Sequence, residues 1–543
     1  MSALKGQRLQ LFALAASSGL LLGLSFPPSP LYTLAYVGFI PLLFVLERLT
    51  QAREVFRYGY VSMMVLHLVS LYWVGGFTHR NDPYLMISGF ALVFGHPLFF
   101  VVPLLVFLLA RRRLGSTAAL VMFPFLWTAF EYSRSLTEFA FPWITLGNSQ
   151  AYDLARLQIA EYTSVYGLSA LLVAFNVLGF VWLKKLASGS WTVPSRQSLL
   201  LLASMLCVYA VPWIYGKAVT VDAVALRAET GVRVGIVQPN IDPWEKWGQQ
   251  GATKWISYNR QYATFLAETE KLLADSLDLV VWPETALPFD PMLSGNGQYL
   301  RGVETLARRG NVSIFTGMPT YVLKEPPIDS AARKFLVYNA ATLISPDSVY
   351  PPYKKVVLVP FAERVPYADV LTFLVEPMRW GVGISGWDKG TQAMSYPLKT
   401  RSNVSTSFAG MICYESIFPW YVRDLVLSGG EILVVITNDS WWGKTSGAYQ
   451  HAAVAALRAV EHRRWIVRCA NGGISGFIDP YGRYQAETAL FSEARLAGVV
   501  RPESSLTFYG RHGDLFAQAC SAATGAFLLV ILFRSRGRRG QRG

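Results

Sequence analysis

Eight apolar segments, each close to the length that crosses a lipid bilayer, constrain the fold of this chain more than any other feature. A transmembrane helix needs about 20 largely apolar residues in a row, because each residue adds about 1.5 Å along the helix axis. The segments lie at roughly residues 9–26, 31–47, 58–76, 85–109, 116–131, 163–183, 198–215 and 515–533. The sequence therefore predicts a helical membrane protein with seven spans before residue 220 and one after residue 510.

The composition supports this prediction. Of the 543 residues, 52% are hydrophobic and 15% are charged, and the mean hydropathy is +0.31, which is too apolar for a soluble protein of this length. The net charge of +14 is compatible with nucleic-acid binding, but the basic residues flank apolar segments and do not alternate with aromatic residues. We therefore expect the membrane to be a partner of this protein and expect no nucleic-acid partner.

Basic residues in the short loops predict the orientation of the helices. With eight spans, five basic clusters fall on one side of the membrane, and Lys and Arg mark the cytoplasmic side. The clusters are Lys5 and Arg8; Arg48, Arg53 and Arg57; Arg111 to Arg113; Lys184, Lys185 and Arg196; and Arg534 to Arg542. The long segment between the seventh and eighth spans then lies on the opposite side, whereas a miscounted span would place it in the cytoplasm.

Residues 220–510 have a different pattern. Short β-rich runs such as VRVGIVQPN, LDLVVWPET and EILVVITND alternate with helical patterns such as AYQHAAVAALRAVEHRRW. This alternation predicts an α/β domain that is long enough to bury a core of its own. We expect helices in residues 1–219, the α/β domain in 220–510, and a last helix with a basic cytoplasmic tail in 511–543.

Cys413 is a candidate nucleophile, because it follows an apolar run that is typical of a buried strand. A nucleophilic cysteine needs a group that accepts its proton or lowers its pKa. His451 and His462 would be the partners in a papain-like dyad, although both fall in an amphipathic helical pattern. A disulfide between Cys413 and Cys469 is another interpretation, which an oxidising compartment would permit. The spacing of cysteines and histidines indicates no zinc site.

Charged residues at two other strand ends add further candidates. Glu284 follows the apolar run in VVWPETALPF, and Lys354 and Lys355 precede the run in YKKVVLVPFAERVP that closes with Glu363. Each position alone is a weak signal, since charged residues at strand ends are usually solvated. Together, a carboxylate, a lysine and a cysteine in this order resemble the Glu-Lys-Cys triad of the nitrilase superfamily.

More closely, the chain resembles the apolipoprotein N-acyltransferase family, which completes bacterial lipoprotein maturation. The resemblance rests on QPNIDPWEKW, WPETALPF, YKKVVLVPFAERVP, ICYESIFP and NDSWWG, and it covers essentially the whole chain. It implies an αββα nitrilase-like sandwich joined to a transmembrane bundle. Two motifs depart from the family pattern: Ala362 stands in place of a glycine, and Ser440 and Trp442 alter N-D-A-W-F-G. Both departures concern loops and leave the reacting groups in place.

The resemblance also implies a role for each motif residue. Glu284 corresponds to the general base, Cys413 to the nucleophile and Lys355 to the triad lysine, since Lys355 has the family's spacing to Glu363. The residues that would line or support the site are Glu363, Trp247, Tyr414, Glu415 and Trp441.

The chemistry that the resemblance implies is acyl transfer in two steps, with no cofactor. A phospholipid gives an acyl chain to the cysteine, and the α-amine of the N-terminal S-diacylglyceryl-cysteine of an apolipoprotein then attacks the thioester. The resemblance places the protein in the bacterial inner (cytoplasmic) membrane, with the catalytic domain on the periplasmic side. The apolar stretch YADVLTFLVEPMRWGVG after Glu363 would either dip toward the acyl chains or form an ordinary packed loop.

Two other functions stay open at this point. A membrane-tethered amidase of the nitrilase type would use the same triad and pass the acyl group to water, but it would not need eight spans. A transporter with an accessory domain would need ionisable residues inside the spans, where few occur besides His67 and His96.

Overall fold

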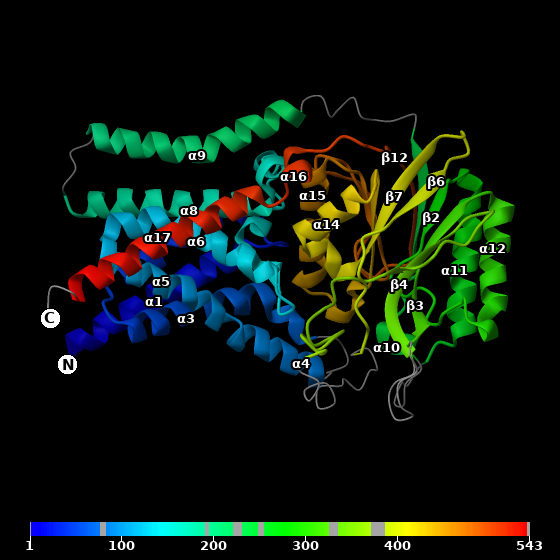
Figure 1. Ribbon diagram of the computed structural model, residues 1–543, viewed down its shortest axis with the longest axis horizontal. Coiled ribbons are helices and arrows are strands. Elements are labelled where there is room, and N and C mark those ends of the chain that lie inside the picture. The colour runs from blue at the N-terminus through cyan, green and yellow to red at the C-terminus, as the bar shows by residue number, and fades with distance from the viewer. Residues whose placement is uncertain are drawn as a thin grey trace.

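The computed structural model describes residues 2–76, 83–189, 195–220, 231–247, 255–324, 335–370 and 386–539. A bundle of long helices and an α/β sandwich lie end to end along the longest axis of the molecule (Figure 1). Both ends of the chain lie at the end of the bundle that is farthest from the sandwich. We call this end the free end of the bundle.

Long apolar helices build the bundle. They are α1 (Ser2–Leu24), α3 (Ala52–Leu71), α5 (Pro97–Leu114), α6 (Ser116–Ser135), α8 (Ala160–Ala187), α9 (Arg196–Thr220) and α17 (Leu515–Arg539). Within the described residues, five helical stretches are long and apolar enough to cross a membrane: Ala52–Gly75, Leu85–Leu114, Ala160–Ala187, Arg196–Thr220 and Leu515–Arg534. The chain therefore has a multi-pass helical membrane region. The other two helices, α1 and α6, occupy the segments predicted at 9–26 and 116–131.

The predicted span at residues 31–47 is wrong as a single helix. This segment forms a short 3-10 helix, η1 (Tyr32–Tyr36), and then α2 (Ile40–Arg48), whose nine residues extend only about 14 Å. The break is stabilised from α8, where the buried Asn176 accepts a hydrogen bond from the Phe39 N–H (2.8 Å) and donates one to the Ala35 carbonyl (2.8 Å). A broken helix is tolerated inside a bundle when such side chains pair with the freed backbone groups.

The helices α1 and α3 run parallel, so α3 begins at the same end of the bundle as α1. The residues between them, 25–51, must therefore lead the chain back along the length of the bundle. The rings of Phe12 and Tyr58 lie 4.7 Å apart, and farther along the same two helices Gly23 faces Val69, whose Cβ would lie 2.7 Å from a Cβ at that glycine. Small residues at such positions let two helix backbones approach closely. The two short helices η1 and α2 therefore make this return in two pieces.

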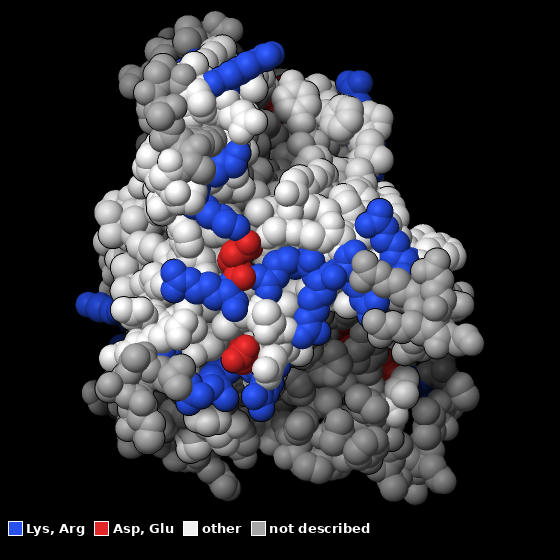
Figure 2. All heavy atoms as spheres, turned by 90° about the vertical axis from the view of Figure 1, so that its left-hand side faces the viewer, with Lys and Arg blue, Asp and Glu red and all other residues white. Residues whose placement is uncertain are grey.

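Basic residues gather on the free end of the bundle (Figure 2). Arg111, in the last turn of α5, donates hydrogen bonds to the carbonyls of Leu46 and Glu47 in the last turn of α2 and of Leu49 just after it. Lys184, near the end of α8, forms an ion pair of 2.5 Å with Glu47. Three of the predicted basic clusters thus meet at one end of the bundle.

The α/β domain is a sandwich of two six-stranded sheets, with the strand orders β12-β1-β2-β3-β4-β5 and β11-β10-β9-β8-β7-β6. The first sheet contains β1 (Val232–Gln238), β2 (Leu279–Val281), β3 (Ser313–Leu323), β4 (Phe335–Ile344), β5 (Tyr353–Lys354) and β12 (Ala494–Val500). The second contains β6 (Ser395–Lys399), β7 (Ser405–Ile412), β8 (Ile432–Thr437), β9 (Ile466–Ala470), β10 (Gly476–Ile478) and β11 (Tyr484–Glu487).

Helices cover the outer face of each sheet (Figure 1). They are α11 (Tyr258–Leu272) and α12 (Gly297–Gly310) on the first sheet, and α14 (Pro419–Leu427) and α15 (Ser446–His462) on the second. The pair α14 and α15 lies between the second sheet and the bundle. The predicted four-layer αββα sandwich is therefore confirmed.

A buried glutamine of α15, Gln450, is one of the residues that join the sandwich to the bundle. The side-chain oxygen of Gln450 accepts hydrogen bonds from the indole N–H groups of Trp73 (3.1 Å) and Trp143 (2.8 Å). Its amide nitrogen donates to the carbonyl of Ser70 at 3.0 Å. Buried tryptophan N–H groups and buried glutamine amides usually have hydrogen-bond partners. Here the two indole N–H groups and both ends of the Gln450 amide are paired.

Candidate active site

Cys413 lies at the turn that follows β7. The strand is buried between its parallel neighbour β8 and β6, and the chain leaves it through Cys413, whose φ of 52° is rare for a residue other than glycine. Strained backbone of this kind persists only where the surroundings hold it, and it clusters at functional sites. The Cys413 carbonyl accepts a hydrogen bond from the Ser416 hydroxyl (2.8 Å) and contacts Nε2 of His451 (3.1 Å).

Glu284 lies two residues after Trp282, at the end of β2. Gly317 of β3 permits this approach, since a Cβ at that glycine would lie 2.9 Å from the Cα of Glu284. The two carboxylate oxygens are held separately: Oε1 accepts from the Asn339 amide (2.7 Å) and Oε2 from the Asn438 backbone N–H (3.1 Å). The carboxylate is therefore fixed in position.

Lys355 lies between two carboxylates and is only 1% exposed. Its Nζ is 2.7 Å from Oε1 of Glu363 and 3.5 Å from Oε1 of Glu284. Asn339 donates to both of these oxygens, at 3.3 Å to Glu363. The structure thus brings Glu284, Lys355 and Glu363 together, as the resemblance implied.

The charges of these groups determine the protonation of the site. Burial raises the pKa of the Cys413 thiol well above its usual value, the charge of Glu284 raises it further, and Lys355 offsets only part of this rise. Burial by itself lowers the pKa of the Lys355 ammonium, but the carboxylates of Glu363 and Glu284 outweigh it, and the net pKa lies above the usual value. At neutral pH the site therefore holds a protonated thiol beside a charged ammonium.

Comparison with known proteins now gives the family. The model of the apolipoprotein N-acyltransferase N-terminal domain matches residues 18–178, and the carbon-nitrogen hydrolase model matches residues 233–505. The chain is 37% identical over 535 residues to the apolipoprotein N-acyltransferase of Chlorobaculum tepidum, covering 97% of each chain. It is 33% identical over 531 residues to that of Geobacter metallireducens, covering 97% of this chain and 96% of the relative.

The chain belongs to the apolipoprotein N-acyltransferase family. The predicted enzyme class is therefore confirmed, namely an acyltransferase of the carbon-nitrogen hydrolase type that acts in lipoprotein maturation.

Glu415 connects two segments of this N-acyltransferase site through hydrogen bonds. Its carboxylate accepts hydrogen bonds from the Tyr353 hydroxyl (2.6 Å) and from the backbone N–H groups of Val356 (2.6 Å), Val357 (3.1 Å) and Ile412 (2.7 Å). Tyr353, Val356 and Val357 lie within two residues of Lys355 in the sequence, and Ile412 directly precedes Cys413. Glu415 therefore ties the lysine loop to the cysteine turn.

The three aromatic residues that the resemblance singled out lie in different surroundings. Tyr414 donates a hydrogen bond of 2.8 Å to the Ala140 carbonyl, which joins the cysteine turn to the segment after α6. The Trp247 ring lies 5.7 Å from Nζ of Lys246, and the Trp441 ring lies 5.4 Å from that of Trp244. Both tryptophans are half-buried.

Sequence reasoning missed two polar residues of the site. Asn339, on β4, bridges the two carboxylates, and Lys246, 2% exposed, donates to the Glu284 carbonyl (3.3 Å) and the Thr285 hydroxyl (2.8 Å). Burial lowers the pKa of Lys246 to about 7. Lys246 stands within the quoted motif QPNIDPWEKW, so its motif was a signal, whereas Asn339 follows a strand pattern with nothing to mark it.

The prediction of a papain-like dyad is wrong, because neither His451 nor His462 contacts the thiol of Cys413 in the described part of the chain. His451 contacts the carbonyl of Cys413, and its other ring nitrogen lies 2.8 Å from Asp439, which also pairs with Arg468 at 2.8 Å. His462 is buried against the ring of Tyr509. His451 therefore supports the backbone of the cysteine turn, where a dyad would require it at the thiol.

The disulfide interpretation also fails in this structure, since all four cysteines are free. The thiol of Cys469 lies inside the sandwich and donates to the carbonyls of Val237 (3.4 Å) and Val281 (3.3 Å). Residues 371–383 of the apolar stretch predicted to dip toward the membrane lie outside the described residues. The described Tyr367 contacts Phe139, with ring centroids 5.5 Å apart and the ring planes tilted by 49°.

The raised pKa of Cys413 predicts how its thiol reacts. We expect alkylation by iodoacetamide to accelerate about tenfold per pH unit between about pH 7 and about pH 9, because only the thiolate reacts. The measurement is the rate of mass gain on the Cys413 peptide, in a Cys207→Ala background that removes the exposed cysteine of α9. A rate that levels off below about pH 7 would contradict the prediction, since it would mean that a thiolate is already stable there.

Proposed function

We propose that this enzyme transfers an acyl chain from a membrane phospholipid, through a thioester on Cys413, to the α-amine of the N-terminal S-diacylglyceryl-cysteine of an apolipoprotein. The observation that carries the proposal is the buried Lys355, which lies between Glu284 and Glu363 and interacts electrostatically with Cys413 on its strained turn. The attachment of this site to the end of a membrane bundle supports a lipid as the acyl donor.

In the first step, the sulfur of Cys413 attacks an ester carbonyl of the donor while Glu284 accepts the thiol proton. The Lys355 ammonium stabilises the oxyanion that forms, together with a backbone N–H that follows the cysteine. The intermediate then collapses: the ester C–O bond breaks, and the lysophospholipid alkoxide takes the proton from Glu284. The products are a thioester and a lysophospholipid.

In the second step, the α-amine of the acceptor attacks the thioester and Glu284 accepts a proton from the attacking nitrogen. The C–S bond breaks, the amide forms, and the proton returns to the sulfur of Cys413. Because the acyl chain is held on Cys413 after the lysophospholipid leaves and before the acceptor attacks, the kinetics should be ping-pong.

The two distances at Lys355 suggest different roles for the two carboxylates. Glu363 is the closer partner, at 2.7 Å, and holds the ammonium in place. Glu284 lies at 3.5 Å, so it is less tightly engaged by the lysine and is better placed to accept a proton. We therefore assign Glu284 as the base and Glu363, Glu415 and Asn339 as positioning residues.

Mass spectrometry of the purified protein tests the mechanism. Incubation with a phospholipid that carries labelled acyl chains should add one acyl chain to Cys413, and a later addition of a diacylglyceryl lipopeptide should remove it and yield the N-acylated lipopeptide. A Cys413 peptide that stays unmodified would contradict the proposal. Loss of the acyl chain to water, with no amide formed, would favour the amidase.

We further propose that the free end of the bundle lies in the cytoplasm and that the α/β domain lies on the periplasmic side of the bacterial inner membrane. The ion pair of Lys184 and the contacts of Arg111 with residues 46–49 support this orientation, because short cytoplasmic loops are enriched in Lys and Arg. With α1, α6 and the two-piece return of residues 25–51 counted as crossings, the chain crosses the membrane eight times.

Reporter fusions test this topology. A reporter at the C-terminal end should be active only as a cytoplasmic probe, and one inserted at Gly295, exposed in η8 (Ser294–Asn296), should be active only as a periplasmic probe. An insertion at Gly189, just after α8, serves as a control that should report the cytoplasm. The reverse pattern would contradict the orientation and the substrate assignment with it.

A further inference from the structure

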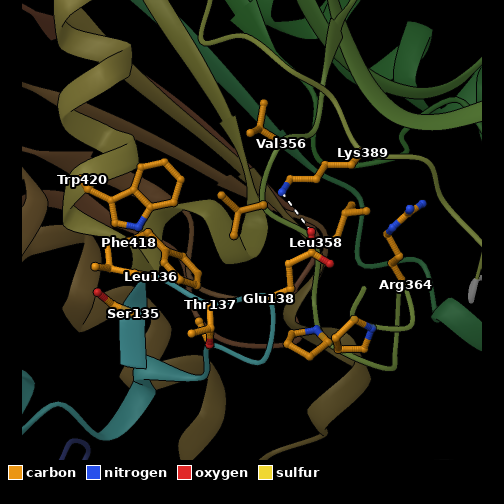
Figure 3. Close-up of a pocket in the computed structure, with 14 residues that line it drawn as sticks. Ser135, Leu136, Thr137, Glu138, Val356, Leu358, Arg364, Lys389, Phe418 and Trp420 are labelled. Carbon is orange, nitrogen blue, oxygen red and sulfur yellow. Dashed lines mark hydrogen bonds and ion pairs between the residues drawn. The ribbon is translucent and has the colours of Figure 1, made fainter. Parts of the chain in front are cut away.

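A cavity of about 190 Å³ lies where the bundle meets the catalytic site (Figure 3). Its lining comes from the segment at the end of α6 (residues 135–140), from the loop after β5 (residues 356–366), from Lys389, and from Phe418 and Trp420 at the start of α14. The loop begins directly after Lys355. The cavity is therefore adjacent to the catalytic groups but does not include them.

The polar groups of this cavity are mainly hydrogen-bond donors. Among the lining residues, Arg364 and Lys389 carry positive charge and Glu138 carries negative charge, and two carboxylates outside the lining, Asp369 and Asp388, also pair with Arg364. Within the described part of the chain, Nε of Arg364 and the indole Nε1 of Trp420 are buried and have no hydrogen-bond partner. Buried donors of this kind are rare without a partner, which indicates that a ligand pairs with them.

The existing ion pairs leave room for such a ligand. Nζ of Lys389 lies 3.4 Å from Glu138, and both side chains are partly exposed. Arg364 contacts Asp369 through Nη2 at 2.7 Å and Asp388 through Nη1 at 3.8 Å, which leaves its Nε unused. Among the described lining residues, every buried side-chain oxygen already has a partner. Because the unused buried groups, Nε of Arg364 and the indole N–H of Trp420, are both donors, the complementary ligand accepts hydrogen bonds.

Size and depth restrict this ligand further. Sites for whole drug-sized ligands measure about 300–1,000 Å³, so a cavity of about 190 Å³ would hold a head group without its acyl chains. The walls between the charged groups are apolar, with Leu136, Val357, Leu358 and Phe418. The cavity also lies at the end of α6, and if α6 crosses the bilayer as proposed above, this end lies near the polar head groups.

We propose that this cavity binds the phosphodiester head group of the acyl donor, with Lys389, Arg364 and the Trp420 N–H as its donors. The inference rests on the proposed function, in which the donor is a phospholipid. Anchoring of the phosphodiester here would hold the glycerol esters beside Lys355 and Cys413. Diacylglycerol, which has the same esters and no phosphodiester, would lack this anchor.

The test compares these two donors in the full-length enzyme in detergent micelles. The rate of thioester formation on Cys413 is measured against the concentration of dipalmitoyl phosphatidylethanolamine or of dipalmitoylglycerol. Trp420→Phe removes the N–H together with one ring of the indole and keeps an aromatic side chain, and Lys389→Ala removes one charge. Each should raise the half-saturating concentration of the phospholipid about tenfold, the range expected for one hydrogen bond to a charged group, and leave that of diacylglycerol unchanged.

Glu138→Gln should act in the opposite direction, because it removes the negative charge that competes for Lys389 and keeps an oxygen acceptor. We expect it to lower the half-saturating concentration of the phospholipid a few-fold. Lys399→Ala, an exposed lysine at the end of β6, is the matched control and should change neither donor. Opposite signs from Glu138 and Lys389 are not expected of a purely structural role.

Equal effects of these variants on both donors would overturn the head-group site, as would no effect on either. In either case the wild type would still form a thioester from the phospholipid, so the proposed function would stand. Soluble glycerophosphoethanolamine should compete with the phospholipid and inorganic phosphate should not; equal competition by phosphate would identify a phosphate site and overturn the proposal. A wild type that forms no thioester from either donor would overturn both the proposed function and this inference.

Discussion

Cys413→Ala is expected to abolish acyl transfer, with activity at least about 10⁴-fold below that of the wild type, because the thioester cannot form without the sulfur. The substitution removes one atom from a turn whose backbone contacts to Ser416 and His451 do not involve the side chain. The variant should therefore remain folded. The measurement is transfer of a labelled acyl chain to a diacylglyceryl lipopeptide, beside a thermal unfolding curve.

Two other cysteines provide matched controls. Cys207 is exposed on α9 and Cys520 is buried in α17, both in the bundle. Cys207→Ala and Cys520→Ala should keep close to full activity. Near-normal transfer by Cys413→Ala would contradict the thioester mechanism, whatever the activity of the two controls.

Lys355→Ala is expected to lower activity by about 10³-fold or more, whereas Lys354→Ala should stay within about threefold of the wild type. Loss of a group that stabilises a developing oxyanion typically costs about 10²–10³-fold, and here the cation also separates two carboxylates. Without it, Glu284 and Glu363 would face each other across Asn339, and one would take up a proton. Lys354 lies instead with its Nζ 4.6 Å from the Tyr338 ring centroid.

The pair is measured in one experiment, by thioester formation on Cys413 from labelled phospholipid. Removal of a buried charge also destabilises a protein by about 3–5 kcal/mol when its partners stay behind. The thermal unfolding midpoint of each variant is therefore measured, to establish that both are folded at the assay temperature. A folded Lys355→Ala protein with full activity, beside an inactive Lys354→Ala protein, would place the triad lysine one residue earlier.

Local sequence was enough to predict the two regions, and the resemblance of its motifs to a known family supplied the candidate triad. Long apolar runs specify membrane helices, and apolar runs that end in Glu284 or Cys413 specify buried strands whose ends carry charge or a thiol. The parallel strands β1 to β3 and β7 to β9 then bring such ends to one edge of the sandwich. These features depend on neighbours along the chain, so one sequence is sufficient to find them.

The failures of prediction have a different physical origin. The break between η1 and α2 depends on Asn176, which accepts a hydrogen bond from the Phe39 N–H and lies 137 residues from Phe39 in the sequence. The sequence offers His451 as a candidate base for Cys413. Its contact with the Cys413 carbonyl, however, is decided by how α15 packs on the second sheet. In both cases contacts between segments far apart in the sequence decided the outcome.

The sequence by itself determined that this protein has membrane helices and an α/β domain, because periodicity and residue type are local properties, and its motifs, through their resemblance to a known family, indicated residues suited to acyl transfer. Only the tertiary structure decided which groups meet. Lys355 reaches Glu284 across 71 residues, and the cavity joins Glu138 of the bundle to Lys389 of the sandwich across 251 residues. Contacts of this kind depend on the packing of the two sheets and the bundle, and no pattern within one segment specifies them.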